Sequence, residues 1–453
     1  MAAARITLMD LSKTVAAALA GERGALIALA VHRLGWPRAD VAMIGRGDAD
    51  AIARVQDAAR SLLAIRSGAA VLPTIVGDHD PRTVAQLARC LDHDDAVAGA
   101  ICADGHLGYS QPVGGVVAYR EHISVSGVGF DIACGNLAVR TDMPFGAVKD
   151  RVDRVLDAIC ARISFGVGRT NDAPVAHALF DDAEAWRAAD AAPLLLAAQK
   201  QLGTVGAGNH YVDLFHEVQP GVSAEASPVW VGIHFGSRGL GHKLATAYLK
   251  RGGGREGIDV PPTLLHQDSD LGRGYLAAMA LAGRYAYAGR DWVAATVLDI
   301  LGAGELDRVH NHHNFAWHEE VAGAPAWVVR KGCTPAFPGQ RGFVGGSMGD
   351  DAVILEGVAG AEATALLSST VHGAGRVFGR QEARRRFARA QMEAWLAERG
   401  VTLRGGDLDE SPMAYRRLPD VLEKHSASIR ILHRLRPFAV AMATTDTVDP
   451  FRD

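Results

Sequence analysis

The sequence predicts a mixed α/β fold, with one large domain of packed β-sheets flanked by helices at 71–453 and a small helical module at 1–70. The segment before residue 70 is rich in alanine, and in 48–64 apolar residues recur three and four positions apart, as in an amphipathic helix. From Val71 onward, short apolar runs rich in β-branched residues are bounded by glycines, which is typical of buried strands. The elements show neither strict βαβ alternation nor a repeat, so a doubly wound sheet is not expected.

The individual elements follow from the same two patterns. The expected strands are the apolar runs bounded by turn residues, at 113–119, 229–235, 325–332 and 351–357. The expected helices are the stretches with helical periodicity, at 148–162, 176–202, 357–369 and 381–399. Strands and helices intermingle along the whole of 71–453, which favours one domain over two.

The composition is that of a globular protein, with 453 residues of which 48% are hydrophobic and 22% charged. No uncharged apolar run approaches the length needed to cross a bilayer, and the first residues lack the pattern of a signal peptide. The five cysteines are odd in number and show no paired spacing, which argues against a disulfide framework and fits a reducing compartment. We therefore expect a cytoplasmic protein with no membrane partner and at least one free thiol.

The distribution of charge leaves two interpretations open for a nucleic-acid partner. The formal net charge of −4 argues against one, because neutralising phosphates requires clustered lysine and arginine. The chain after His372 is nevertheless rich in arginine, with Arg376, Arg380, Arg384, Arg385, Arg386, Arg389, Arg416, Arg417, Arg430, Arg434 and Arg436. For the run from 384 to 389, an ordinary solvated helix face is as good an explanation as a phosphate-binding surface.

Five glycine-padded segments between Gly129 and Arg376 each present a metal ligand or a nucleophile: GFDIACG, GAGNHYVD, IHFGSRG, HNHHNF and VHGAGR. Glycine flanks allow the backbone to approach a ligand closely and to hold strained turns. The side chains presented in this way are Asp131, Cys134, His210, His234, His313 and His372. A single cysteine or histidine is more often a core residue than a ligand, but this many in glycine-bounded turns indicate a metalloenzyme.

The mixture of donor atoms narrows the choice of metal. Asp131 and Cys134 lie three positions apart, so one turn can direct both at a shared ion. A thiolate and a carboxylate together suit zinc, manganese or iron better than calcium or magnesium. The set could hold one ion or two, and a cysteine bridging two ions would form a two-metal clamp of the kind used in phosphoryl transfer.

His372 is the histidine left over for chemistry. Gly373 and Gly375 leave room for a phosphate beside its ring, and Arg376 offers a planar fork to phosphate oxygens. A neutral imidazole is a competent nucleophile and can form a covalent phosphoramidate. We therefore interpret 71–453 as a catalytic domain with a phosphoryl-transfer site.

The same motifs, in the same order, resemble those of RtcB-type RNA-splicing ligases from about Ile75 to Val440. The blocks that carry the resemblance are ADGHLGYSQPVGG, GVGFDIACGN, GTVGAGNHYVD, IHFGSRGLG, HHNF, VVRKG, GGSMG, HGAGRVFGR and SPMAYRRL. Chance agreement over so many ordered blocks is implausible. The resemblance implies an RtcB-like fold and a ligase that joins an RNA 3′-phosphate or 2′,3′-cyclic phosphate to an RNA 5′-hydroxyl, in RNA repair or tRNA splicing.

Cofactors and partners are also implied by this resemblance. It implies two Mn²⁺ ions, GTP that guanylylates a histidine, and RNA ends as the substrate, and it admits an archease-type activator. Cys134 would bridge the ions. Asp131 and His210 would complete one site, and His234 and His313 would complete the other.

Further roles are implied for residues in the same blocks. His372 would be the guanylylated nucleophile, and Asp104 would orient its ring as a carboxylate orients a catalytic imidazole. Arg238 and Arg376 would bind phosphates of the RNA end. The residues expected to contact the nucleotide are Asn209, Tyr211, Asp213, Ser347, Gly373, Gly375 and Tyr415.

The sequence departs from the family pattern mainly where the nucleotide would bind. Asp213 stands where the family usually has a glutamate that reads the guanine edge, and Met442 stands where it usually has a terminal lysine. Asp104 begins DGH in place of the more frequent DVH, and the segment before residue 70 is outside the usual pattern. Two other hypotheses therefore remain. One is a divergent relative that acts as a metal-dependent phosphodiesterase or phosphatase or uses another nucleotide, and the other is a non-catalytic protein that binds RNA ends.

Overall fold

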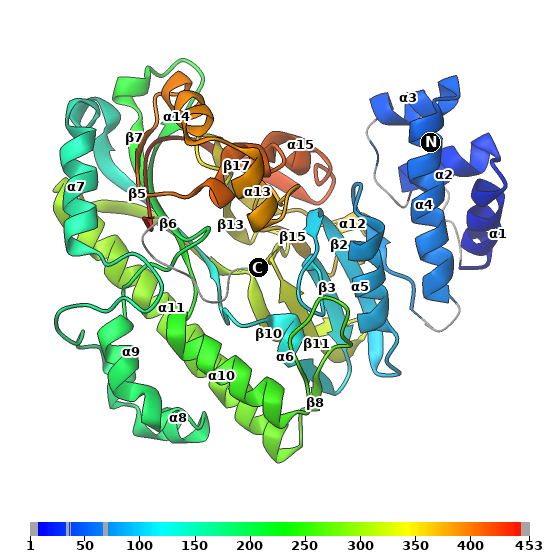
Figure 1. Cartoon of the computed structure of the whole chain (residues 1–453), viewed down its shortest axis with the longest axis horizontal. Helices are drawn as coiled ribbons and strands as arrows, with labels where there is room; N and C mark the ends of the chain where they lie inside the picture. The colour runs from blue at the N-terminus through cyan, green and yellow to red at the C-terminus, as the bar shows by residue number, and fades with distance from the viewer. Residues whose placement is uncertain (1–7, 33–35, 37, 67–70, 445–453) are drawn as a thin grey trace.

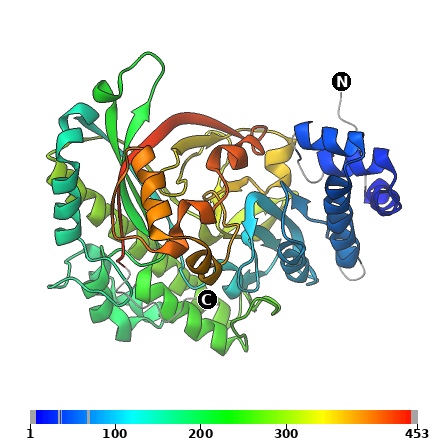
Figure 2. The same cartoon turned by 45° about the horizontal axis from the view of Figure 1, so that its top comes forward.

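The structure, a computed structural model, describes residues 8–32, 36, 38–66 and 71–444. Within this part of the chain, helices and strands succeed one another irregularly around two large sheets, so the predicted mixed α/β class is confirmed. Figures 1 and 2 show the two sheets next to each other and the N-terminal helices at one end of the molecule. The ends of the two predicted domains, at 1–7, 67–70 and 445–453, lie outside the described residues.

The larger sheet has eight strands in the order β13-β14-β17-β6-β7-β5-β9, with β16 paired to β17. Its strands are β5 (Gly135–Pro144), β6 (Tyr211–Val218), β7 (Pro228–Phe235), β9 (Glu305–His312), β13 (Arg341–Val344), β14 (Ala352–Gly357), β16 (Thr402–Arg404) and β17 (Ile429–Met442). All neighbours are antiparallel except β16 and β17. The strands β6, β7, β5 and β9 are neighbours in this sheet. The predicted ligands lie at or next to the same end of these strands, so the sheet brings them close together.

The second sheet has five strands in the order β1-β2-β3-β11-β10. These are β1 (Thr74–Ile75), β2 (Ala96–His106), β3 (Val113–Tyr119), β10 (Asn314–Val321) and β11 (Ala324–Lys331). Two small sheets pair β12 (Cys333–Pro335) with β15 (Ser369–Val371) and β4 (His122–Ser124) with β8 (Leu264–His266). The two large sheets share an apolar core that includes Val116 and Val328 of the second sheet and Val353 and Leu355 of the first.

The helices lie on the outside of the sheets. They are α1 (Leu8–Leu19), α2 (Arg23–His32), α3 (Arg38–Arg46), α4 (Ala49–Arg66), α5 (Pro81–Leu91), α6 (Val125–Val128), α7 (Val152–Arg162), α8 (Ala183–Ala188), α9 (Leu195–Gln201), α10 (Arg238–Arg251), α11 (Asp270–Leu301), α12 (Ala361–Ala365), α13 (Arg380–Arg386), α14 (Arg389–Glu398) and α15 (Leu418–Glu423). Helices α7 and α11 cover the larger sheet, and α4 lies beside α5 (Figure 1). None of the helices in the described residues has both the length and the apolar character required to span a membrane.

The helices α1 to α4 agree with the predicted helical segment at the start of the chain. They bury apolar side chains such as Leu26, Leu29 and Val55 in a core that also contains Leu87 of α5. The division of the chain into two domains at residue 70 stays a prediction.

Each predicted strand is confirmed to within one residue of its bounds, whereas the predicted helices need correction. The single helix expected at 176–202 is wrong, because Asp182 accepts a hydrogen bond from Ala185 N at 3.1 Å and starts a new helix. Pro193 then lies in the first turn of the next one. The helix expected at 381–399 is split where Phe387 adopts an extended conformation.

The helix expected at 357–369 is likewise too long, and the one at 148–162 begins late. Only Ala361–Ala365 forms a helix in the former, because Gly357 still belongs to β14 and Ser369 already belongs to β15. In the latter, the first residues form short 3₁₀ turns before the α-helix starts at Val152. Periodicity alone thus overestimates the length of these two helices.

Helix α11 is the longest element, with 32 residues, and the sequence did not predict it. The Ser269 hydroxyl accepts a hydrogen bond from Gly272 N at 2.9 Å at its start, and Gly302 ends it with φ of 67°. Its interior glycines permit close packing, since a Cβ atom on Gly289 would lie 3.2 Å from the Phe235 ring. This close approach places the next residue, Arg290, against the end of the larger sheet.

Candidate metal and nucleophile site

The predicted site residues converge on one cavity of about 780 Å³ that both large sheets line. Its lining includes all of the predicted ligands and binding residues, namely Asp131, Cys134, Asn209, His210, Tyr211, Asp213, His234, Arg238, His313, Ser347, His372, Gly373, Gly375, Arg376 and Tyr415. Asp104 is fully buried immediately behind His372. Residues spread over most of 71–453 thus meet at one place.

Cys134 lies between two groups of possible metal ligands. Its Sγ atom is 3.7 Å from Nε2 of His210 and 3.7 Å from Nε2 of His234. On one side, His210 Nε2 lies 3.1 Å from Asp131 Oδ2, and on the other, the rings of His234 and His313 stack with centroids 5.2 Å apart. Within each set of three residues the ligand atoms lie within 4.8 Å of one another, and both sets contain Cys134.

Strand pairing explains why these ligands meet. In the register of the larger sheet, Gly135 of β5 pairs with Phe235 of β7 on one side and with His312 of β9 on the other. Ligands adjacent to these three positions in the sequence are therefore neighbours in space. The turn before β5 needs Ala133 at φ of 59°, a left-handed conformation, and closes with a 3.0 Å hydrogen bond from Cys134 N to Asp131 O.

The electrostatics of the site fit metal ligands. Burial, reinforced by neighbouring imidazoles, lowers the pKa of His234 and of His313 well below the ordinary value, so both rings are neutral and keep a lone pair. Nδ1 of His313 is buried without a hydrogen-bond partner in the described part of the chain and is available as a ligand. Burial and the nearby Asp131 raise the pKa of the Cys134 thiol, and a bound divalent cation would reverse that effect.

Asp131 is already ionised. Burial alone would raise the pKa of this carboxyl, but the hydrogen bond and charge of His210 lower it to about 2. Carboxylate, thiol and imidazole together form a donor set that suits zinc, manganese or iron. The residues present thus fit two cations that share Cys134.

His372 is held by Asp104 on the other side of the cavity. Its Nδ1 atom donates to Asp104 Oδ2 at 2.6 Å, and its backbone N–H donates to the same oxygen at 3.0 Å. Burial would raise the pKa of Asp104, but the charge and hydrogen bonds of His372 lower it below the ordinary value. The bound carboxylate fixes the ring and leaves Nε2 as the free nitrogen. The ring centroids of His372 and His313 are 4.9 Å apart, so the free nitrogen belongs to the metal-ligand cavity.

Asp213 and Met442 lie on adjacent strands at the end of the cavity. In the antiparallel pairing of β6 and β17, Asp213 is opposite Val440, and Met442 is opposite Tyr211. Burial raises the pKa of Asp213 well above its ordinary value, and its Oδ1 atom has no hydrogen-bond partner in the described part of the chain. This end of the cavity therefore presents, beside a methionine, a carboxyl whose protonated form is favoured by burial.

The other predicted nucleotide contacts surround the two ligand sets. Tyr211 stacks on His234, with centroids 5.4 Å apart, and Asn209 Nδ2 lies 3.4 Å from His234 Nε2. The Ser347 hydroxyl donates to Asp350 Oδ2 at 3.1 Å. These polar side chains line the cavity next to the two ligand sets.

Comparison with known proteins identifies the family. Residues 84–443 match the family described as tRNA-splicing ligase RtcB. This chain belongs to the RtcB family. Its relatives include the RNA-splicing ligase RtcB of Mycobacterium tuberculosis, 32% identical over 74% of this chain and 94% of the relative. The tRNA-splicing ligase RtcB of Archaeoglobus fulgidus is 30% identical over 76% of this chain and 87% of the relative. The RNA-splicing ligase RtcB of Escherichia coli is 27% identical over 74% and 88%.

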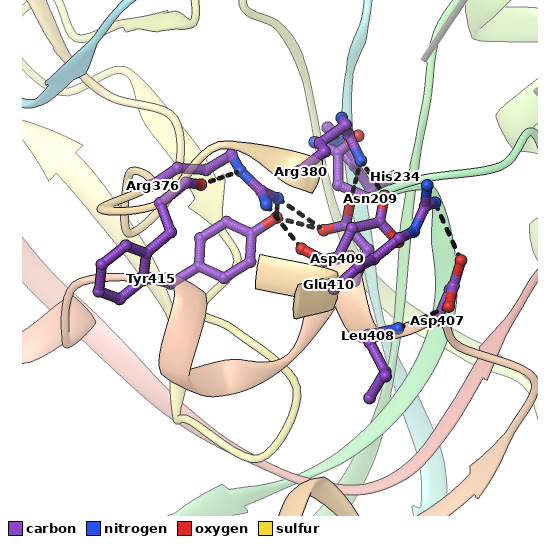
Figure 3. A network of polar contacts seen from close by, with 11 residues as sticks. Asn209, His234, Arg376, Arg380, Asp407, Leu408, Asp409, Glu410 and Tyr415 are labelled. Atoms are coloured by element: carbon purple, nitrogen blue, oxygen red, sulfur yellow. Dashed lines mark hydrogen bonds and ion pairs between the residues drawn. The ribbon is translucent and has the colours of Figure 1, made fainter. Parts of the chain in front are cut away.

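The arginines of this RtcB chain that follow His372 are largely neutralised within the molecule. Arg376 donates to Tyr415 Oη at 2.7 Å and to the backbone oxygen of Asp409 at 2.6 Å (Figure 3). Arg380 forms ion pairs with Asp409, at 3.0 Å, and with Glu410. The prediction that Arg376 binds an RNA phosphate therefore requires the phosphate to compete with these partners. Arg238, the second predicted phosphate ligand, donates to Gly166 O at 2.9 Å.

Asn136 and Lys331 are among the residues of the RtcB site that were not predicted from the sequence. Asn136 Oδ1 accepts a hydrogen bond from His234 Nδ1 at 2.6 Å, which leaves Nε2 of that histidine facing Cys134. Lys331 is buried, donates to the backbone oxygen of Tyr109 at 2.6 Å, and has its pKa lowered to about 8 by burial. Asn136 ends the GVGFDIACGN block, and alternation along β5 could have placed it on the Cys134 side.

Proposed function

We propose that this RtcB chain is a GTP- and Mn²⁺-dependent RNA ligase that joins RNA 3′-phosphate or 2′,3′-cyclic phosphate ends to 5′-hydroxyl ends. The observation that carries the proposal is a histidine with one nitrogen held by a carboxylate, in the same cavity as two ligand sets that share a cysteine. The relatives in Archaeoglobus fulgidus and Escherichia coli are named as tRNA- or RNA-splicing ligases, which supports the same class of substrate.

Two Mn²⁺ ions would be held by the two ligand sets, with Cys134 as the shared ligand. When bound, such ions neutralise phosphate charge and align the reacting oxygens. The lowered pKa values of His234 and Asp131 leave the imidazole neutral and the carboxylate ionised, which are the forms that bind a cation. Asn136 fixes the His234 tautomer so that Nε2 remains free for the cation.

The nucleophile of the proposed reaction is Nε2 of His372. It attacks the α-phosphorus of GTP, an N–P bond forms, and the bond to the pyrophosphate oxygen breaks. Asp104 retains the proton on Nδ1 and stabilises the positive charge that develops on the ring. The RNA 3′-phosphate, produced by hydrolysis where the end is cyclic, then takes GMP from His372 as the N–P bond breaks. Finally the 5′-hydroxyl oxygen attacks the RNA 3′-phosphorus and GMP leaves.

A second candidate, a relative that uses another nucleotide or acts as a phosphodiesterase, is favoured by the end of the cavity at Asp213 and Met442. A guanine edge presents two N–H donors and is best bound by an ionised carboxylate, whereas burial raises the pKa of Asp213 well above its ordinary value and so favours the neutral carboxyl. Buried polar groups that lack a partner cost about 1–3 kcal/mol each, so this difference can change the choice of base.

Covalent labelling tests the proposal. Incubation with α-labelled GTP and Mn²⁺ should attach GMP through an acid-labile, alkali-stable bond, and peptide mapping should place it on His372. The His372→Ala variant should lose the label and ligation but still bind metal, and Asp104→Ala should label slowly. The same assay with each other nucleoside triphosphate identifies the base that is used. An adduct on another residue, such as Lys331, or no adduct with any nucleotide would reject the mechanism and leave the phosphodiesterase.

A further inference from the structure

Arg290 is a completely buried cation that forms no ion pair with any carboxylate in the described part of the chain. It lies on α11, on the face that packs against the larger sheet. Burial lowers the pKa of its guanidinium to about 10, which still leaves it charged at neutral pH. An unpaired charge inside a protein is strongly destabilising, so its retention calls for an explanation beyond packing.

The partners of Arg290 are backbone oxygens and imidazoles next to the proposed metal ligands. Its Nη1 atom donates to Ala133 O at 3.1 Å and also to Phe235 O. Its Nη2 atom lies 3.1 Å from His312 Nδ1, and its Nε atom donates to His310 Nε2 at 2.7 Å. Each of the first three partners is the immediate sequence neighbour of a proposed ligand.

The three neighbouring ligands are Cys134, His234 and His313, and they belong to three different segments. Cys134 lies just before β5, which begins at Gly135, and His313 lies just after β9, which ends at His312, whereas His234 lies within β7 and pairs with Asn136 of β5. Strand pairing alone therefore does not orient Cys134 and His313, and their orientation depends on other contacts. A planar guanidinium with several fixed donors is suited to hold several acceptors at once.

We propose that Arg290 is a positioning residue of the metal centre, whose guanidinium fixes the ends of β5, β7 and β9 so that Cys134, His234 and His313 face one point. The inference rests on the proposed metal site. Arg290 would promote metal binding through the geometry of its hydrogen bonds and not through its charge, because a positive charge by itself repels a bound cation.

The alternative is that Arg290 only stabilises the fold. Substitution would then lower the melting temperature without changing how the folded protein binds a metal. A matched control is available in Arg330, which is also completely buried but pairs with Glu319 at 2.6 Å. Arg330→Met removes a buried guanidinium at a position where its partners are not neighbours of the proposed ligands.

The experiment compares Co²⁺ binding by the metal-free full-length chain and by its Arg290→Lys, Arg290→Met and Arg330→Met variants. The thiolate-to-cobalt absorption band reports ligation by Cys134, and a competing chelator gives the affinity. Loss of residues that orient metal ligands typically lowers affinity by about 10–100-fold. We expect both Arg290 variants to lose affinity by at least about tenfold and to weaken or shift the band. Arg330→Met should bind as the wild type does.

The outcomes separate the inference from the proposed function. If the wild type shows no thiolate-to-cobalt band, the metal site itself is wrong, and the role of Arg290 falls with it. If the wild type shows the band and folded Arg290→Lys has the same band and affinity, Arg290 is not a positioning residue. Arg290→Lys keeps the charge and most of the length of the side chain but loses the planar set of donors, so it decides the question even where Arg290→Met does not fold.

Discussion

At the scale of single residues, Cys134 is the group on which both proposed metal sites depend. Cys134→Ala should remove the shared ligand and reduce Mn²⁺-dependent ligation by at least about 100-fold, with a loss of bound metal measurable after dialysis. Cys102→Ala and Cys333→Ala are the controls, because these buried thiols belong to neither ligand set. Near wild-type ligation by Cys134→Ala would eliminate the proposed site.

Asp213 gives a prediction about stability and pH. Burial raises its folded-state pKa above the ordinary 3.8, so the folded protein holds a proton that the unfolded chain releases. The stability contributed by this carboxyl is complete below the unfolded pKa and is lost as the pH rises through the folded pKa. Asp213→Asn is neutral at every pH, and it should raise the melting temperature by ~2 °C or more at mildly alkaline pH.

That difference in melting temperature should close as the solution is acidified, when measured on nucleotide-free protein. The exposed Asp259, paired with Arg89 at 3.2 Å, provides a control substitution, Asp259→Asn, for which no such gain is expected. A gap between Asp213→Asn and the wild type that is independent of pH would show that Asp213 is ionised in the folded state.

The residues that line the cavity could be predicted because each stands in a motif with a recognisable ligand or nucleophile. Asn136 and Arg290 could not be assigned their roles in the same way. An asparagine that fixes a histidine tautomer and an arginine that bonds to backbone oxygens leave no characteristic spacing. Their roles depend on which strands pair, and that is a property of the tertiary structure.

At the scale of elements, the end of β7 is packed directly against the carboxylate of Asp131. A Cβ atom on Gly236 would overlap that carboxylate, although the φ of Gly236 is not in the left-handed region. Gly236→Ala should therefore displace Asp131 and lower metal affinity by about tenfold, measured by competition for Mn²⁺. Gly45→Ala in α3 is the control, because nothing lies within 4 Å of its added Cβ. Unchanged affinity in Gly236→Ala would exclude Asp131 as a ligand.

The elements were predicted unequally for physical reasons. Runs of β-branched residues mark buried strands, and their bounds agree with the structure. Helices depend on caps and breaks that periodicity does not show, such as Asp182 at the start of α8. Helix α11 was missed because its interior glycines resemble turn residues. In the structure they allow close packing against aromatic rings, since a Cβ atom on Gly283 would lie 3.1 Å from the Phe315 ring.

At the scale of the whole molecule, the arginines after His372 that line the cavity, Arg376 and Arg380, are paired with carboxylates, so the unpaired positive charge at the cavity comes from other elements. Arg384 pairs with Asp407 at 2.9 Å, and Arg417 pairs with Asp350 at 2.7 Å. Lys200 of α9 and Lys243 of α10 are exposed, line the cavity, and have no ion-pair or hydrogen-bond partner for their ammonium groups in the described part of the chain. The arginine-rich segment of the sequence therefore did not predict where unpaired positively charged side chains line the cavity.

If the substrate is RNA, its backbone should pass over α9 and α10, where these two ammonium groups are free. Lys200→Glu and Lys243→Glu should each weaken binding of a 3′-phosphorylated RNA. Each should also reduce the slope of log affinity against log salt concentration by ~0.7, the value for one lost contact with a single strand. Fluorescence anisotropy over a range of salt concentrations measures both effects.

Lys149→Glu is the control. It changes the net charge equally, but Lys149 lies outside the cavity and pairs with Glu225 at 3.3 Å, so it should leave the slope unchanged. Equal effects of all three substitutions would mean that only net charge matters and that RNA does not follow this rim.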